Sequence, residues 1–217
     1  MEKNFAHVVY AIEKGFWIGN HSFTHPHFSD ITIEQARQEI EQTEILINKA
    51  YSIAQAPRPA KLFRFPYMDK GQKQGLTHVK AIQDLLSSLE FERLNFQGTE
   101  RHPALIEREE DIDAAWTFDA REYALFSEAT KKKFNLFKTA DFVQRIAEEL
   151  FQFRRTTEIV LFHDFEQTHE LFSPLLTKLL DLNVQFRAPL LQKHVPLGIE
   201  KPLAQLAVAS EESPADA

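Results

Sequence analysis

Three of the nine histidines of this chain lie within seven positions, in the stretch GNHSFTHPHF that ends at Phe28. His21 and His25 are separated by three residues, and His27 follows Pro26. Histidine is the commonest transition-metal ligand in proteins and also serves as a general acid or base. Two histidines four apart can meet one metal ion if the segment turns helically. A polar turn with incidental histidines is the alternative interpretation.

Other reactive side chains come directly after short apolar runs. Arg64 follows KLF, Asp119 follows AAWTF, and His163 follows EIVLF, with Asp164 next to it. A buried arginine usually pairs with a carboxylate, although an arginine in a surface ion pair of little energetic value gives the same pattern. His163 could be an acid or base, or a hydrogen-bonded structural histidine. Glu122 could simply face water.

The hydrophobic pattern predicts the elements that must position these residues. We expect helices at residues 4–15, 32–54, 76–91, 139–153 and 170–182, and short strands at 16–20, 61–67, 114–119, 158–165 and 184–187. Thr32 is the expected N-cap of the longest helix. One apolar stripe of that helix comprises Ile33, Ala36, Ile40, Thr43 and Ile47. The alternation of strands and helices predicts an α/β fold, with a parallel sheet or barrel.

The positions of the polar residues favour a barrel. The histidine pair, Arg64, Asp119 and His163 each come at the end of a different expected strand. In α/β barrels the working residues lie at the C-terminal ends of the strands and on the loops that follow. We therefore expect these side chains to meet at one end of the barrel.

The composition is that of a globular protein with one core. The 217 residues are 43% hydrophobic, and 19 of them are phenylalanine, so phenylalanine should supply much of the core. A net charge of -7 argues against a nucleic-acid partner. The absence of cysteine from the sequence excludes disulfides, thiolate metal sites and a cysteine nucleophile.

Residues 1–197 are expected to form one domain. Residues 198–217 are small, acidic and contain proline, which predicts a disordered tail. We find no signal peptide and no stretch of membrane-spanning length, so the chain as written is expected in the cytoplasm, away from membranes. A longer precursor could be exported.

Four short motifs together resemble a known family. HSFTH, RFPY, DAREY and LFHD are similar, in order and interval, to motifs two to five of the polysaccharide deacetylases, the NodB-homology domain of carbohydrate esterase family four. The family patterns are approximately H-[ST]-x-x-H, R-x-P-Y, D-x-x-D-W and L-x-H-D. The resemblance covers about residues 1–187. It implies a distorted (β/α) barrel that hydrolyses N-acetyl groups of amino sugars with a divalent metal, usually zinc.

The resemblance implies a role for individual positions. His21 and His25 match the two metal histidines, and Arg64 matches the arginine that orients a catalytic-base aspartate. Asp119 matches the carboxylate that tunes the acid histidine, and His163 matches that histidine. Metal would polarise the acetyl carbonyl and activate a water molecule, and the acid would protonate the leaving amine.

On the substrate side, the backbone N–H of Tyr67 matches the oxyanion donor, and Leu161 matches the wall of the acetyl pocket. Glu122 and Tyr123 replace the usual Asp and Trp of motif four. Both changes are conservative and chiefly affect the expected shape of the sugar site, for which Tyr123 is a candidate contact.

The family's first motif, T-F-D-D-G, occurs nowhere in the 217 residues. Its first Asp is the base and its second is the third metal ligand, so the resemblance implies an N-terminally incomplete barrel with two-thirds of a metal site. His27 and Asp30 are the only nearby substitutes. We expect a hydrolase impaired in this chain. The alternatives are a non-catalytic family member that binds sugar or metal, and an unrelated α/β protein with structural histidines and a protein partner.

Overall fold

The computed structural model describes residues 2–96, 111–122, 132, 139–152, 156–163 and 169–191. Their main helices are α1 (Phe5–Glu13), α2 (Ile33–Ala54), α3 (Leu76–Ser88), α6 (Thr139–Gln152) and α7 (His169–Asp181). The 3-10 turns are η1 (Glu2–Asn4), η2 (Phe28–Asp30), η3 (Pro66–Met68) and η4 (Gln72–Gln74). Strands β1 (Phe118–Asp119) and β2 (Val160–Leu161) pair in parallel. The predicted tail at 198–217 lies outside the described residues.

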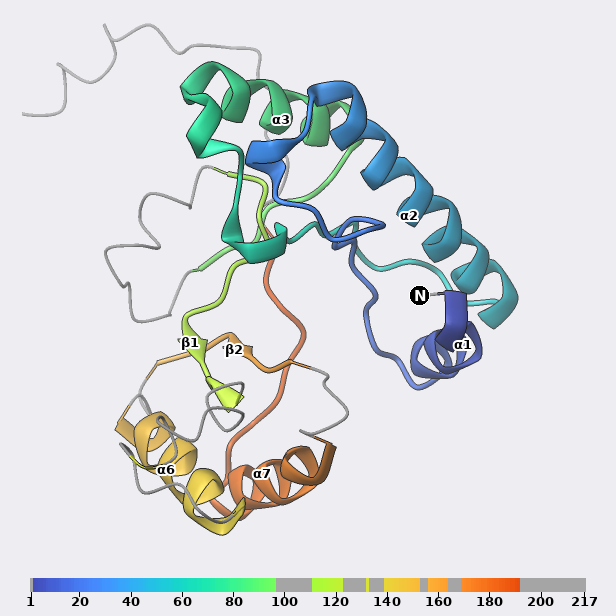
Figure 1. Cartoon of the computed structure of the whole chain (residues 1–217). Helices are drawn as coiled ribbons and strands as arrows, with labels where there is room; N and C mark the ends of the chain where they lie inside the picture. Colours follow the sequence, from blue (N-terminus) through green and yellow to red (C-terminus); the bar gives the residue numbers. More distant parts are fainter. Residues whose placement is uncertain are drawn as a thin grey trace, which may run out of the picture.

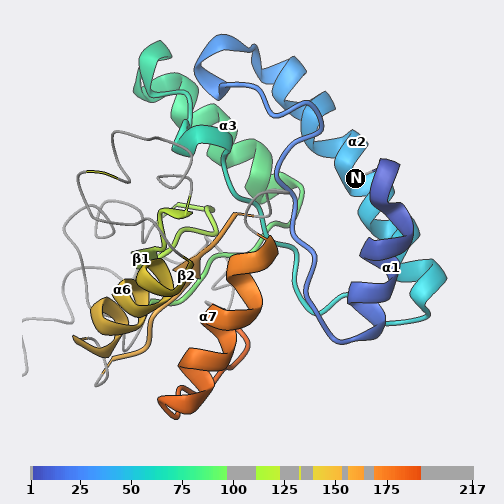
Figure 2. The ribbon, with the colours of Figure 1, turned by 60° about the horizontal axis from the view of Figure 1, so that its bottom comes forward.

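The elements form two groups (Figure 1). Helices α1, α2 and α3 lie together on one side, and β1 and β2 lie with α6 and α7 on the other. Figure 2 shows the same division from another direction, with extended segments running between the two groups. Within this described part, no helix is long and apolar enough to cross a membrane.

The expected strands are extended segments that share only a few ladder hydrogen bonds. Asn20 and Phe63 form an isolated parallel bridge, and the Ala114 N–H donates to the Phe63 carbonyl over 2.6 Å. Further on, β1 and β2 are aligned so that Asp119 lies opposite Leu161. Parallel pairing brings the C-terminal ends of paired segments to the same edge, which places the residues after them side by side.

The predicted strands are correct in place but too long, and one of them is wrong. No described segment pairs with residues 184–187, which carry no regular secondary structure. Val184 and Phe186 are both exposed, so their alternation with polar residues does not reflect one buried sheet face. Strand formation needs a neighbouring backbone as well as alternation.

The helix predictions agree closely with the structure. Thr32 caps α2 through a capping box: its hydroxyl accepts the Gln35 N–H, and the Gln35 side chain accepts the Thr32 N–H. Four members of the predicted stripe are buried, namely Ala36, Ile40, Thr43 and Ile47. Helix α2 therefore presents one face to the core and the other to solvent.

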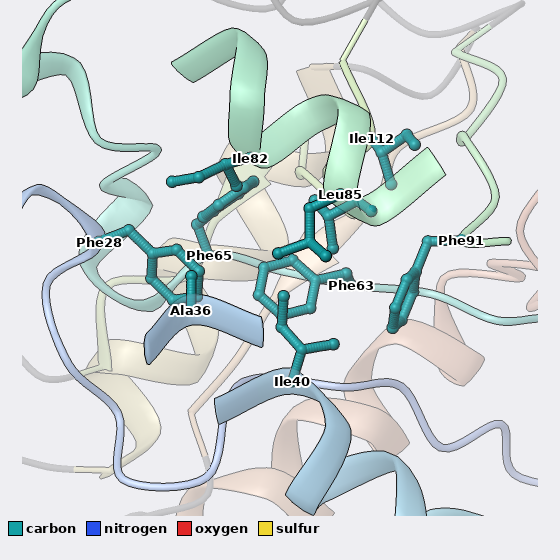
Figure 3. Packing of buried hydrophobic residues seen from close by; sticks show 10 residues of the cluster. Phe28, Ala36, Ile40, Phe63, Phe65, Ile82, Leu85, Phe91 and Ile112 are labelled. Atoms are coloured by element: carbon teal, nitrogen blue, oxygen red, sulfur yellow. The ribbon is translucent and has the colours of Figure 1, made fainter. Parts of the chain in front are cut away.

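Phenylalanine builds the core beneath the histidine segment (Figure 3). Phe63 packs edge-to-face against Phe28, Phe65 and Phe91, with ring centroids 5.7, 4.9 and 5.7 Å apart. Ile40 of α2 and Leu85 of α3 close over these rings. Because Phe63 and Phe65 flank Arg64, this core fixes the segment that carries the arginine.

Candidate active site

His21 and His25 converge on each other. The Nδ1–H of His21 donates to the Arg64 carbonyl over 2.8 Å, and the Nε2 atoms of the two histidines lie 3.1 Å apart. The rings meet edge-on, with centroids 4.8 Å apart. Because a carbonyl oxygen can only accept, Nδ1 of His21 carries the proton and its Nε2 lone pair faces His25.

The surroundings keep both histidines neutral. Burial lowers the pKa of His21 to about 4, and the charges of Arg64, His25 and His163 act in the same direction, against the bond to the Arg64 carbonyl. The pKa of His25 is also lowered, by burial and by the charges of Arg64 and His27. The effect of His163 on His21 shows that residues far apart in sequence share one site.

The histidine pair fits part of a metal site. Two nitrogens bound to a tetrahedral zinc ion at about 2.0–2.1 Å lie about 3.4 Å apart, close to the 3.1 Å found here. Neutral imidazole is also the form that binds metal. However, no group of three His, Cys, Asp or Glu side chains able to hold a metal occurs in the part of the chain that is described. His27 and Asp30 therefore do not complete the set.

His27 is held by the neighbouring loop. Its Nδ1 lies 3.2 Å from Asp69 Oδ2, and its ring stacks on Tyr67 with centroids 4.0 Å apart. Asp69 also accepts the Ser29 hydroxyl at 2.5 Å and the N–H groups of Ser29 and Gly71 at 3.1 and 2.9 Å. The third histidine thus ties the segment after His25 to the RFPY loop.

Tyr67 lies beside the histidine pair on a strained turn. Its φ of 54° and the 58° of Met68 are both left-handed, a conformation that persists at functional sites when the surroundings enforce it. The Tyr67 ring meets His25 edge-on with centroids 4.6 Å apart. The two hydrogen bonds of this turn are donated by the N–H groups of Met68 and Asp69, so neither uses the Tyr67 N–H.

Arg64 has a buried carboxylate near it that sequence reasoning missed. Burial lowers the pKa of the Arg64 guanidinium, and the charge of Asp113 opposes this shift. Asp113 is 3% exposed and accepts the Phe65 N–H at 3.4 Å. The available signal was an acidic residue beside the apolar run AAWTF. Asp113 is thus a buried carboxylate whose charge acts on Arg64.

The carboxylate at His163 is Glu122. Glu122 Oε1 accepts the His163 N–H over 2.8 Å and lies 2.5 Å from His163 Nδ1. The Glu122 side chain is fully buried, so the suggestion that it faces water is wrong. Its Oε2 is buried without a hydrogen-bond partner among the described residues.

Asp119 forms a tight turn with the residues that follow it. Its Oδ1 accepts the Arg121 N–H over 2.8 Å, and Arg121 has a left-handed φ of 55°. Glu122, three residues after Asp119, lies at Nδ1 of His163, and the expected contact between Asp119 and His163 stays a prediction. Leu161 is buried in β2 opposite Asp119.

Two expected site residues, Tyr123 and Asp164, lie outside the described residues.

Comparison with known proteins gives a consistent result. The sequence model of the family described as polysaccharide deacetylase matches residues 3–83. This N-terminal part of the chain is therefore similar to the polysaccharide deacetylases. No curated protein matches it.

Solved structures show the fold. A family 4 carbohydrate esterase from Streptomyces lividans, in complex with acetate, matches with a TM-score of 0.50 at 19% identity over 83% of this chain and 69% of that one. A CE4 family pseudoenzyme from Bacillus anthracis matches with a TM-score of 0.51 at 17% identity over 83% of this chain. A mutant of that pseudoenzyme with restored enzymatic activity matches with a TM-score of 0.50 at 18% identity.

The fold is the distorted, incomplete (β/α) barrel of the polysaccharide deacetylases. This chain spans 47% of the length of the wild-type pseudoenzyme and 49% of the mutant. Three of the four deacetylase motifs quoted from the sequence contribute residues to one site: HSFTH supplies His21 and His25, RFPY supplies Arg64, and LFHD supplies His163, whose charge acts on His21. The remaining motif, DAREY, joins this site through Glu122.

Proposed function

We propose that this site is that of a metal-dependent hydrolase that removes N-acetyl groups from amino sugars of a polysaccharide or a related non-peptide amide. The observation that carries the proposal is the convergence of two neutral imidazoles, with Nε2 atoms 3.1 Å apart, beside His163. A divalent cation, most simply zinc, would polarise the acetyl carbonyl there.

The residues of this chain have separate parts in the proposed reaction. His21 and His25 would hold the cation through their Nε2 atoms, and the Tyr67 N–H would donate to the developing oxyanion. His163 donates a proton from Nε2 to the leaving amine, while Glu122 orients its ring through Nδ1. Leu161 borders the acetyl group.

A second function is favoured by one specific observation. The described residues offer no third protein ligand for a metal, and the sequence contains no T-F-D-D-G motif. A non-catalytic family member that binds sugar or metal without turnover would have this combination. The cytoplasmic location and the lack of a nucleic-acid or membrane partner remain predictions from the sequence.

Zinc binding and acetate release test the proposal. Calorimetry should show one zinc site in the 217-residue chain, abolished in His21→Ala and His25→Ala and retained in His7→Ala, an exposed histidine of α1. Acetate release from chitin oligomers by the zinc-loaded chain, absent in His163→Asn, would establish the hydrolase. Zinc binding without acetate release, even when the chain is extended by in-frame upstream residues, would favour the non-catalytic alternative.

A further inference from the structure

The loop between His21 and His25 is shaped by side chains. The backbone N–H groups of the four residues from Ser22 to His25 all donate to side-chain oxygens. Asn20 Oδ1 accepts the first at 2.9 Å, and Ser22 Oγ accepts the last at 3.1 Å. Without backbone partners for these groups, the loop adopts whatever conformation its side-chain acceptors impose.

Glu39 accepts the two central N–H groups. Its Oε2 receives the Phe23 N–H at 2.8 Å and the Thr24 N–H at 2.7 Å, and its Oε1 receives the Thr24 hydroxyl at 2.7 Å. Hydrogen bonds to an ionised carboxylate are stronger than those between neutral groups. Glu39 therefore makes more and stronger bonds to this loop than Asn20 or Ser22.

Glu39 differs from the other acceptors in where it comes from. Asn20 and Ser22 belong to the histidine segment itself, so they move with it. Glu39 belongs to α2, which is fixed by its capping box and by the burial of Ala36 and Ile40 on either side of Glu39 in sequence. The carboxylate thus connects the loop to a rigid helix.

The loop needs such a connection because it is strained. Ser22 and His25 both have a left-handed φ of 63°, which side chains with a Cβ adopt only when the surroundings enforce it. In this conformation the His25 ring lies against that of His21, with centroids 4.8 Å apart. Relaxation of either residue would separate the two Nε2 atoms.

We propose that Glu39 is a positioning residue that holds the loop from Ser22 to His25 so that the imidazoles of His21 and His25 face each other. An effect of Glu39 on metal affinity is expected only if the proposed function is correct. The loop geometry does not depend on the proposed function, and it can be measured in the metal-free chain.

The experiment compares three variants with the wild-type chain. Glu39→Ala removes the carboxylate, and Glu39→Gln keeps its length and one acceptor oxygen. Glu41→Ala is the matched control, because Glu41 lies exposed on the same helix and makes only a surface ion pair with Arg37 at 3.2 Å. NMR of the metal-free chain measures the nuclear Overhauser effect between the two imidazoles and the exchange rates of the Phe23 and Thr24 amides. Calorimetry measures zinc affinity.

We expect Glu39→Ala to lose the imidazole contact, to raise both exchange rates at least about tenfold, and to weaken zinc binding by about 10–100-fold, the usual cost of losing outer-shell support. Glu39→Gln should restore most of each property, and Glu41→Ala should match the wild type. Should Glu39→Ala not fold, Glu39→Asp, which keeps the charge but shortens the reach, takes its place with the same expectations.

An unchanged imidazole contact in a folded Glu39→Ala or Glu39→Asp chain would overturn the inference. If the wild-type chain binds no zinc while Glu39→Ala loses the contact, the proposed metal site fails and the positioning role stands. If zinc binds the wild type and Glu39→Ala equally, the positioning role fails and the proposed metal site stands.

Discussion

One carboxylate oxygen of Glu122, Oε1, makes two contacts with His163. It accepts the backbone N–H of His163, and it lies 2.5 Å from His163 Nδ1. Residues from two neighbouring parallel segments are thereby fixed to each other at the strand ends. The fully buried carboxylate has no other hydrogen-bond donor among the described residues, so His163 and Glu122 depend on each other.

Truncation of Glu122 should therefore destabilise the fold. Glu122→Ala leaves the half-buried His163 N–H without its acceptor, which we expect to lower the free energy of unfolding by about 1–3 kcal/mol. Urea denaturation followed by circular dichroism measures the change. Glu148→Ala is the control, because Glu148 is an exposed residue of α6 that accepts a hydrogen bond from Gln144 of the same helix. It should change the value by at most about 0.5 kcal/mol. Equal effects of the two variants would contradict the pairing.

The pKa of the half-buried His21 should lie well below the ordinary value of histidine. In the metal-free chain we expect NMR to show a pKa of about 4 for His21. As the pH falls below about 6.5, His21 takes up a proton in the unfolded chain but not in the folded chain. The contribution of neutral His21 to stability is therefore fully present above about pH 6.5 and is lost as the pH falls toward 4. His21→Asn should remove this part of the pH dependence. A pKa near 6.5 for His21 would show that its surroundings do not desolvate the imidazole.

Asp69 should stabilise the joined loops above acidic pH. Burial raises the pKa of its carboxyl, but hydrogen bonds from Ser29, Gly71 and His27 outweigh burial and lower it below its usual value. A depressed carboxyl pKa adds stability above the unfolded value of about 3.8, and this is lost as the pH falls through the folded pKa. We expect Asp69→Asn to cost about 1–3 kcal/mol at pH 7, with the difference shrinking below about pH 4.

The control for Asp69→Asn is Asp84→Asn. Asp84 is an exposed residue of α3 whose carboxylate pairs at the surface with Lys80. Its stability should stay close to that of the wild type at every pH. A loss that is as large at pH 3 as at pH 7 would mean that shape rather than charge decides the contribution of Asp69.

The aromatic core should be as important for the site as for stability. Phe63 is fully buried, contacts three other phenylalanines and bridges to Asn20, next to His21. Phe63→Ala should lower the free energy of unfolding by about 3–5 kcal/mol. Phe16→Ala, at a side chain that is 66% exposed, should have little effect. Similar denaturation midpoints for the two variants would contradict the packing in Figure 3.

Helices and the histidine pair could be predicted from sequence because their causes are local. The capping signal at Thr32 and the apolar stripe of α2 need no knowledge of distant residues, and the spacing of His21 and His25 is a local pattern. Strand lengths could not be predicted, because pairing depends on neighbours far along the chain. This is why residues 184–187 alternate like a strand and yet are unpaired in the described structure.

The partners within the site were also beyond local reasoning. Asp113 and Arg64 are 49 positions apart, and Glu122 and His163 are 41 apart. Only the tertiary structure shows that Glu122 lies at the imidazole of His163. Glu39 carried no sequence signal beyond its place at the edge of a buried stripe, although its bonds shape the histidine loop.

The 217-residue chain should be a poor catalyst even with zinc. Its sequence contains no T-F-D-D-G motif, and among the described residues no third metal ligand joins His21 and His25. General-base catalysis is typically worth about 10²–10⁴ in rate, and a cation held by two imidazoles would activate its water less than one held by three ligands. We therefore expect little or no acetate release from chitin oligomers by this chain with zinc. A chain extended by in-frame upstream residues containing F-D-D-G should be active. Full activity of the 217-residue chain would contradict this prediction and would mean that another carboxylate, such as Asp30 or Asp164, acts as the base, which Asp30→Asn and Asp164→Asn would then identify.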